Sequence, residues 1–284
     1  MDRSIGYDLI AIDVDGTLLD TSHRVPPAHR DALHRAHDAG LRVVICTGRS
    51  YPEIRAILDH LSIEFDATIT VSGALVSHAA TGRTLSVNAI EPSAAARLHT
   101  WLRELGYAVL WLANRAECGH DGYALAGPRM HAGHRNWLDK TPCVVHPVET
   151  LPPNPAAALR LSVIDDRPAL QVVAGDLVRR FAGEFSHNLL DAPSYRLTVL
   201  EILAAHVSKW RAIESLCGVW GIDTRRTAAV GDDVNDLEMV RRAGLGVAMG
   251  NAVPAVRAVA RRTTLTNDEG GLAVVIDDIL AGRA

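Results

Sequence analysis

The sequence predicts an α/β fold, with a parallel sheet at the centre of a core and an α+β segment inserted into that core. Short apolar runs alternate with helix-like stretches before residue 85 and after residue 190, which is the pattern of parallel strands joined by crossover helices. Between those positions the alternation becomes looser. The expected core strands are 7–13, 41–46, 67–71, 227–231, 245–248 and 263–266, and the expected core helices are 27–39, 51–60, 207–219, 234–242, 252–260 and 271–281.

Local signals support these boundaries. Pro26 and Pro27 open the first helix, where a missing backbone N–H costs nothing, and Gly40 closes it. The Pro-rich stretch 151–155 is expected to be a loop. The middle region is expected to contain helices at 92–105 and 168–182 and strands at 107–112, 159–164 and 185–190. We therefore expect a core made of residues 1–84 and 191–284 and an inserted domain at 85–190.

Length and composition agree with two globular domains. The chain has 284 residues, which exceeds the size at which one hydrophobic core stops growing. Hydrophobic residues make up 48% and charged residues 22% of the chain, as in ordinary globular proteins. The formal net charge of −4 provides no basic field for nucleic acid. An anionic ligand must therefore be attracted by a local cation.

The sequence gives no sign of export or membrane insertion. Met1–Gly6 lacks the apolar region of a signal peptide, and no uninterrupted apolar run reaches the roughly 18 residues of a membrane span. We expect a cytoplasmic protein that is a monomer or homodimer. The sequence contains no C-x-x-C pair, so we expect neither a zinc site nor a disulfide framework. Reduced thiols are expected for the four cysteines, Cys46, Cys118, Cys143 and Cys217.

Chemistry-bearing residues gather where predicted strands end. Asp13-Val14-Asp15-Gly16-Thr17 follows the first apolar run and places two carboxylates at the end of a buried strand. Open parallel sheets bind ligands outside the carboxyl ends of their strands, and a glycine there lets backbone amides close around a phosphate. Cys46-Thr47-Gly48-Arg49 follows the second run.

Two further segments lie later in the chain. Lys209, one of only two lysines, stands at the start of a predicted helix, and Gly231-Asp232-Asp233-Val234-Asn235-Asp236 follows another strand. Each segment alone is compatible with an ordinary turn or a surface charge. Four of them at strand or helix boundaries predict a single phosphate site.

With these motifs the chain resembles phosphohydrolases of the haloacid dehalogenase (HAD) superfamily, specifically the Cof-like group with a type C2B cap. The motifs appear in the family's order over nearly the whole length, and the segments 245–251 and 266–271 also resemble this group. The resemblance implies a Rossmann-like core and an inserted α+β cap that sets specificity.

Motif spacing agrees with that subtype. About 30 positions separate Thr17 from Thr47, whereas about 160 separate Arg49 from Lys209, against the ~30 residues of a minimal βαβ unit. The cap is therefore expected in the second gap. Phosphoglucomutase-like members carry their cap in the first gap instead.

The resemblance also implies roles for the motif residues. Asp13 is the nucleophile that forms an aspartyl-phosphate, and Asp15 is the general acid and then the base. Carboxylates repel a phosphate, so a hard cation is required, and Mg²⁺ fits. Its expected ligands are the Asp13 carboxylate, the Asp15 backbone carbonyl and Asp232. The expected ligands of the phosphoryl oxygens are Thr47, the Gly48 amide, Lys209 and Asn235.

Four more positions border this site. Asp236 is expected to hold the metal's waters or to orient Lys209. Asp233 is either a metal-side helper or, as we favour, an acidic residue at a helix start. Ser72 stands where the group usually has asparagine, and Trp210 follows the motif lysine where glycine is common. We expect bulk at position 210 to narrow the leaving-group side.

Together these observations predict a Mg²⁺-dependent phosphatase of small phosphorylated metabolites, with sugar phosphates first and cofactor phosphates next. Two alternatives stay open. One is a phosphotransferase or mutase that passes the phosphoryl group to a second hydroxyl. The other is a non-catalytic protein that binds a phosphorylated metabolite, which the intact Asp13, Asp15, Lys209 and Asp232 disfavour.

Overall fold

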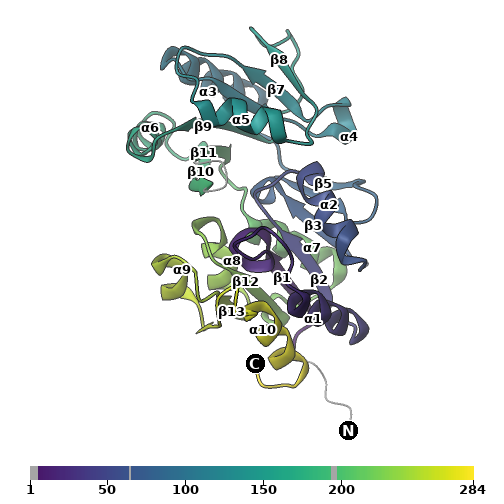
Figure 1. The fold of residues 1–284 in the computed structure, drawn as a ribbon. Helices are drawn as coiled ribbons and strands as arrows, with labels where there is room; N and C mark the ends of the chain where they lie inside the picture. Colours follow the sequence, from purple (N-terminus) through teal and green to yellow (C-terminus); the bar gives the residue numbers. More distant parts are fainter. Residues whose placement is uncertain (1–5, 64, 193–196) are drawn as a thin grey trace. The chain divides into compact units, whose positions relative to one another are not determined.

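The computed structural model describes residues 6–63, 65–192 and 197–284 (Figure 1). The chain divides into two compact units. The core unit consists of Met1–Leu85 and Ser208–Ala284, and the inserted unit consists of Ser86–Val207. Each unit is built on its own sheet.

The core unit contains an eight-stranded sheet in the order β14-β13-β12-β1-β2-β3-β4-β5. The strands from β14 to β3 pair in parallel, and β4 turns back antiparallel on β3. The strands are β1 (Leu9–Asp13), β2 (Arg42–Cys46), β3 (Ala67–Thr70), β4 (Leu75–His78), β5 (Thr84–Val87), β12 (Thr227–Gly231), β13 (Leu245–Ala248) and β14 (Arg262–Thr263).

The strand order reverses at β1. The chain runs outward from β1 to β2 and β3, then later returns to the other side of β1 as β12 and continues outward to β13 and β14. Every residue of β1 and β12 is buried, which explains their continuous apolar sequences. Open α/β sheets bind ligands where the strand order reverses, at the carboxyl ends of the strands.

Helices cover the core sheet, and their sequences contain the expected end signals. Helix α1 packs against α10, and α8 packs against α7 and α9 (Figure 1). Pro27 opens α1, and Ser50 and Glu53 form a capping box at the start of α2. The core helices are α1 (Pro27–Asp38), α2 (Tyr51–Leu61), α7 (Lys209–Trp220), α8 (Leu237–Arg242), α9 (Pro254–Val259) and α10 (Gly271–Leu280).

The inserted unit contains a six-stranded sheet in the order β10-β11-β9-β6-β7-β8, antiparallel except for the pair β7 and β8. Its strands are β6 (Val109–Leu112), β7 (Gly122–Leu125), β8 (Val145–Val148), β9 (Arg160–Asp165), β10 (Phe185–Ala192) and β11 (Leu197–Ala204). Its helices are α3 (Pro92–Glu104), α4 (Arg115–Cys118), α5 (Ala132–Lys140) and α6 (Arg167–Arg180).

Helices pack on both faces of the inserted sheet. On one face, His99 of α3 contacts the ring of Trp111, and Trp101 of α3 contacts Phe181 at the end of α6. On the other face, α5 packs Trp137 into a small apolar cluster. This is the α+β arrangement expected of the insert.

Three details of the core unit and its boundary differ from the sequence expectations. The second domain boundary falls after Val207 rather than at 190, because β11 pairs with β9 and β10 in the inserted sheet. The short hairpin strands β4 and β5 extend the core sheet beyond the expected β3. The expected helix 234–242 divides into a 3₁₀ turn, η5 (Val234–Asp236), and α8.

Across the described ranges, the helices are too short or too polar to cross a lipid bilayer.

Candidate active site

The parallel strands bring three of the four motifs to one edge of the core sheet. Asp13 is the last residue of β1 and pairs with the last residue of β2. On the other side of β1, Ile12 lies opposite Val230 of β12. Thr47 and Asp232, which follow β2 and β12, therefore leave the sheet on either side of Asp13.

Lys209, the first residue of α7, joins two buried carboxylates. Its Nζ donates hydrogen bonds to Asp13 Oδ1 at 2.5 Å and to Asp236 Oδ1 at 2.6 Å. The Lys209 side chain has no solvent exposure. Burial by itself lowers the pKa of Lys209, but the carboxylates of Asp13 and Asp236 outweigh burial and raise that pKa above its ordinary value. Lys209 is therefore a buried cation.

The carboxylates around Lys209 repel one another. Burial raises the pKa of Asp13 well above its ordinary value, and Asp236 raises it further, whereas Lys209 lowers it. Burial and the neighbouring Asp236 raise the pKa of Asp232 to about 8, although a hydrogen bond from Thr17 opposes that shift. One ammonium group thus faces three carboxyl groups, an imbalance that an additional cation would relieve.

A sharp turn carries Asp15 away from Asp13 and toward Arg49. The Arg49 guanidinium donates to both oxygens of Asp15, with Nε 2.8 Å from Oδ2 and Nη2 2.5 Å from Oδ1. The turn needs Gly16, which has φ +76° and whose added Cβ would lie 2.2 Å from Asp232 Oδ2. Asp13 and Asp15 therefore have opposite surroundings, one buried against a lysine and the other half-exposed against an arginine.

Asp236 and Asp233 also shape the backbone around Asp232. Asp236 Oδ2 accepts hydrogen bonds from the backbone N–H groups of Asp232 and Asp233, at 2.9 and 3.1 Å. Asp233 caps η5 by accepting from the N–H of Val234 at 2.7 Å. Asp236 thus orients Lys209 through one oxygen and the Asp232 loop through the other, and Asp233 has the helix-start position that the sequence favoured.

Comparison with known proteins identifies the family that has this fold and these motifs. A family model described as haloacid dehalogenase-like hydrolase matches residues 10–276. The chain belongs to this family. It is accordingly an enzyme, a hydrolase of the phosphatase type.

Curated relatives and solved structures cover nearly all of the chain. It is 29% identical to 5-amino-6-(5-phospho-D-ribitylamino)uracil phosphatase YwtE of Bacillus subtilis, over 96% of this chain and 98% of that protein. It is 31% identical to HMP-PP phosphatase of Cronobacter sakazakii, over 86% and 84%. A haloacid dehalogenase-like hydrolase structure from B. subtilis has 25% identity and a TM-score of 0.78, with 95% of this chain and 99% of that chain covered.

The remaining phosphate-binding candidates of this HAD hydrolase lie on the same edge of the sheet. Thr47 is buried, and its Oγ1 accepts the backbone N–H of Arg49 at 3.0 Å. Gly48 lies between these two residues and is the second residue after β2. Asn235 lies in η5, next to Asp236.

The acidic cluster fits a divalent cation. Oxygen atoms of Asp13, Asp232 and Asp236 lie within 4.8 Å of one another, and carboxylate oxygens are the ligands that Mg²⁺ prefers. Asp236 is the most enclosed of the three, because its side chain has no solvent exposure and its oxygens accept from Lys209 and from two backbone N–H groups. Asp13 and Asp232 are therefore the carboxylates best suited to a cation.

Residues 71–73 hold the helix that carries Lys209. Val71 and Ser72 have φ of +50° and +56°, a region that β-branched residues rarely adopt. Gly73 has φ +106°, and its added Cβ would lie 2.3 Å from the carbonyl oxygen of Ser208. This segment therefore packs directly against the start of α7. Ser72 occupies a left-handed position, which explains why asparagine suits it.

Trp210 contradicts the expectation that its bulk narrows the leaving-group side. It is only 2% exposed and belongs to the hydrophobic core of the core unit. The Arg242 guanidinium lies 5.5 Å from the ring centroid. The helical turn points Trp210 into the interior, although its neighbour Lys209 reaches the acidic cluster.

Sequence reasoning gave no role to three residues that contact this cluster. Arg49 holds Asp15, Thr17 Oγ1 donates to Asp232 Oδ1 at 3.0 Å, and Asn251 approaches the other oxygen of Asp232. Arg49 and Thr17 lie within recognised motifs, which is a signal for their importance. Asn251 ends the segment 245–251, which also resembled the family, but no local pattern indicated that it would pair with Asp232.

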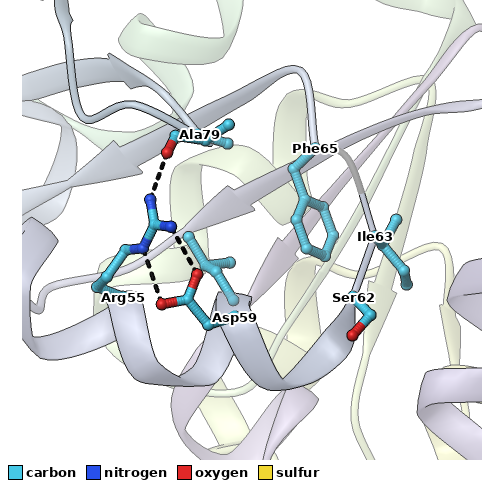
Figure 2. Close-up of a pocket in the computed structure, with 8 residues that line it drawn as sticks. Arg55, Asp59, Ser62, Ile63, Phe65 and Ala79 are labelled. Carbon is cyan, nitrogen blue, oxygen red and sulfur yellow. Dashed lines mark hydrogen bonds and ion pairs between the residues drawn. The ribbon is translucent and has the colours of Figure 1, made fainter.

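A separate hollow lies beside the end of α2 (Figure 2). Arg55 lines it and pairs with Asp59 in the next helical turn, and Phe65 supplies an apolar wall. None of its lining residues belongs to the motifs, so we assign it no part in the chemistry.

Proposed function

We propose that the protein is a Mg²⁺-dependent phosphatase of small phosphorylated metabolites, with sugar and related polyol phosphates as the leading substrate class. The observation that carries the proposal is the buried contact of Lys209 with Asp13, beside Asp232, where the strand order reverses. A carboxylate held at a fixed position by a buried ammonium group is suited to in-line attack on phosphorus.

The proposed reaction has two steps. An Asp13 carboxylate oxygen bonds to phosphorus while the ester bond breaks, and Asp15 gives its proton to the leaving oxygen. Asp15 then takes a proton from water, the water oxygen bonds to phosphorus, and the aspartyl-phosphate bond breaks. The products are inorganic phosphate and the alcohol, and Asp13 is restored.

The contact between Arg49 and Asp15 affects the step in which Asp15 gives its proton to the leaving oxygen. Both oxygens of Asp15 accept hydrogen bonds from the Arg49 guanidinium, so in this arrangement the carboxyl group of Asp15 is directed at Arg49 rather than at a leaving group. Asp15 must therefore turn away from Arg49 before it protonates the leaving group. The half-exposed position of the pair leaves room for that movement.

The Asp13 and Asp232 carboxylates and the backbone carbonyl of Asp15 are the proposed cation ligands. A bound Mg²⁺ would offset negative charge on the carboxylates and on the phosphoryl oxygens. Lys209, Thr47, the Gly48 amide and Asn235 are proposed to bind the phosphoryl oxygens.

The inserted unit is proposed to act as the cap that selects the leaving group. Relatives that match most of this chain have different substrates in their names, which supports a specificity determinant outside the shared motifs. The name of the B. subtilis relative includes a phosphorylated ribityl chain, a polyol, which supports the leading substrate class.

A phosphate-release assay over a panel of phosphorylated sugars, polyols and cofactors tests the proposal. We expect release that requires Mg²⁺, stops with EDTA and is fastest for a sugar or polyol phosphate. A competing alcohol tests the phosphotransferase alternative, because transfer would produce a new phosphate ester. Absence of turnover across the panel with Mg²⁺, or equal turnover without it, would contradict the proposal.

A further inference from the structure

A residue near the C-terminus, Asn251, contacts the acidic turn, which is the segment 13–17 that carries Asp13 and Asp15. Asn251, just after β13, donates from Nδ2 to the carbonyl oxygen of Gly16 at 2.8 Å and to Asp232 Oδ2 at 3.4 Å. It therefore contacts both the turn that carries Asp15 and a proposed cation ligand. The first contact has the length of a normal hydrogen bond, and the second is at the long end of the range.

Asn251 is itself held in place by Asn267. The backbone N–H of Asn267 donates to Asn251 Oδ1 at 3.0 Å. Because that N–H must face an acceptor, it assigns the oxygen of the Asn251 amide and leaves Nδ2 facing Gly16 and Asp232. The two asparagines thus form a chain of hydrogen bonds, in which Asn267 donates to Asn251 and Asn251 donates to Gly16 and Asp232. We call this chain the relay.

The far end of the relay is anchored in buried structure. Asn267 is 4% exposed, and its Nδ2 donates to the carbonyl oxygen of Leu19 at 2.8 Å. The segment before it packs closely on Gly250, whose added Cβ would lie 2.7 Å from the N of Thr266. The anchored Asn267 therefore holds the side chain of Asn251 in position, although Asn251 itself is exposed to solvent.

The relay supplies the second of two donors to the Asp232 carboxylate. Thr17 Oγ1 donates to Oδ1 at 3.0 Å, and Asn251 Nδ2 approaches Oδ2. Donors on both oxygens restrict rotation of the carboxylate about its last side-chain bond. Groups that orient a metal ligand in this way are worth ~10–100-fold in metal affinity or activity.

We propose that Asn251, oriented by Asn267, is a positioning residue that sets the Asp232 carboxylate and the acidic turn for binding a divalent cation. The inference rests on the proposed function, because it takes Asp232 as a cation ligand. The inference also gives a structural role to the segments 245–251 and 266–271, which lie outside the four motifs.

Mg²⁺ binding to the whole protein, measured by titration calorimetry without substrate, tests the inference. We expect Asn251→Ala to weaken Mg²⁺ binding about tenfold. Arg257→Ala is the matched control, because Arg257 Nη1 donates to the neighbouring carbonyl of Gly250 at 3.2 Å but does not touch Asp232. The control should bind Mg²⁺ like the unaltered protein, and excess Mg²⁺ should recover most of the activity of Asn251→Ala.

A double-mutant cycle tests the direction of the relay. Asn267→Ala removes the side-chain anchor on the Leu19 carbonyl but keeps the backbone N–H that binds Asn251. If that anchor acts through Asn251, Asn267→Ala should weaken Mg²⁺ binding by itself, and the double variant should bind Mg²⁺ no more weakly than Asn251→Ala alone. Thermal unfolding with and without Mg²⁺ provides a second measurement, because a ligand stabilises according to its affinity. Asn251→Ala should gain less from Mg²⁺ than Arg257→Ala does.

The outcomes separate this inference from the function on which it rests. Unaltered affinity in Asn251→Ala, with binding by the unaltered protein intact, would overturn the positioning role and leave the cation site standing. Failure of the unaltered protein to bind Mg²⁺ would overturn both.

Discussion

At the scale of single residues, the buried contact between Lys209 and two carboxylates decides what Asp13 can do. Removing charged groups from water is costly, and the cost is repaid only when each group has well-placed partners. Lys209 donates to both Asp13 and Asp236, and Asp236 also holds the Asp232 loop. The arrangement therefore keeps Asp13 in one position at the carboxyl end of β1.

Asp13→Asn should reduce turnover to background while the fold and the affinity for inorganic phosphate remain largely intact. The substitution removes the nucleophile without changing side-chain volume and keeps an acceptor for Lys209. Steady-state kinetics and calorimetric phosphate binding check both parts. Trapping of the aspartyl-phosphate or its beryllofluoride analogue on another residue would contradict the assignment.

Asp15→Asn should lower the rate about 10²–10⁴-fold, the usual contribution of a positioned acid–base group. The loss should be smaller for p-nitrophenyl phosphate, whose leaving group needs little protonation. Asp31→Asn, an exposed carboxylate on α1, is the control and should have no effect. Equal losses on good and poor leaving groups would remove Asp15 from the acid role.

At the scale of elements, the segment 71–73 follows β3 in the chain and packs against the start of α7. Consecutive left-handed residues are strained, and such strain persists only where surrounding structure requires it. Here the backbone must approach Ser208 closely enough to exclude a side chain at Gly73. The position of Lys209 therefore depends on backbone geometry in a distant part of the sequence.

Gly73→Ala should destabilise the protein by about 2–4 kcal/mol, because alanine is strained at this φ and clashes with the Ser208 carbonyl. It should also lower kcat by displacing Lys209. Gly218→Ala is the matched control within α7, where an added Cβ meets nothing within 4 Å. That control should be neutral or stabilising. Thermal unfolding and kinetics measure both effects, and equal behaviour of the two variants would contradict the argument.

His134, a buried residue of helix α5, should make the free energy of unfolding depend on pH. Burial lowers the pKa of His134 from 6.5 to about 4. Between pH 6.5 and 4 the unfolded chain therefore binds a proton that the folded chain excludes, and the free energy of unfolding falls as the pH falls. The contribution is up to about 3 kcal/mol.

Chemical denaturation at pH 7 and pH 4.5 measures this effect. His134→Gln should reduce the difference between the two pH values, whereas His60→Gln, at an exposed position on α2, should not. An unchanged pH dependence in His134→Gln would assign the acid sensitivity to other groups.

At the scale of the whole molecule, the core unit has its own sheet and its own hydrophobic cluster. All the proposed catalytic residues belong to it, whereas the inserted unit contains none of them. This division predicts that chemistry and substrate selection are separable.

Replacing Ser86–Val207 by a short Gly/Ser linker should leave weak, Mg²⁺-dependent hydrolysis of p-nitrophenyl phosphate and erase discrimination among natural metabolites. Circular dichroism first establishes that the shortened protein is folded. A folded core that still ranks substrates as the whole protein does would show that specificity does not come from the inserted unit.

Local sequence determined most of the core elements of this protein and the segments that carry its motifs. The apolar runs before Asp13 and Asp232 and the Pro and Gly signals around α1 are properties of neighbouring residues, so they are visible without a fold. The resemblance rested on such local segments, and the family match confirmed it.

Only the tertiary structure decided which distant residues meet. β11 joins the inserted sheet because its partners are β9 and β10, and Trp210 enters the core while Lys209 beside it reaches Asp13. The contact of Asn251 with Gly16 spans 235 positions of sequence. No local pattern encodes such a contact, because it arises from packing of elements whose order in the sheet differs from their order in the chain.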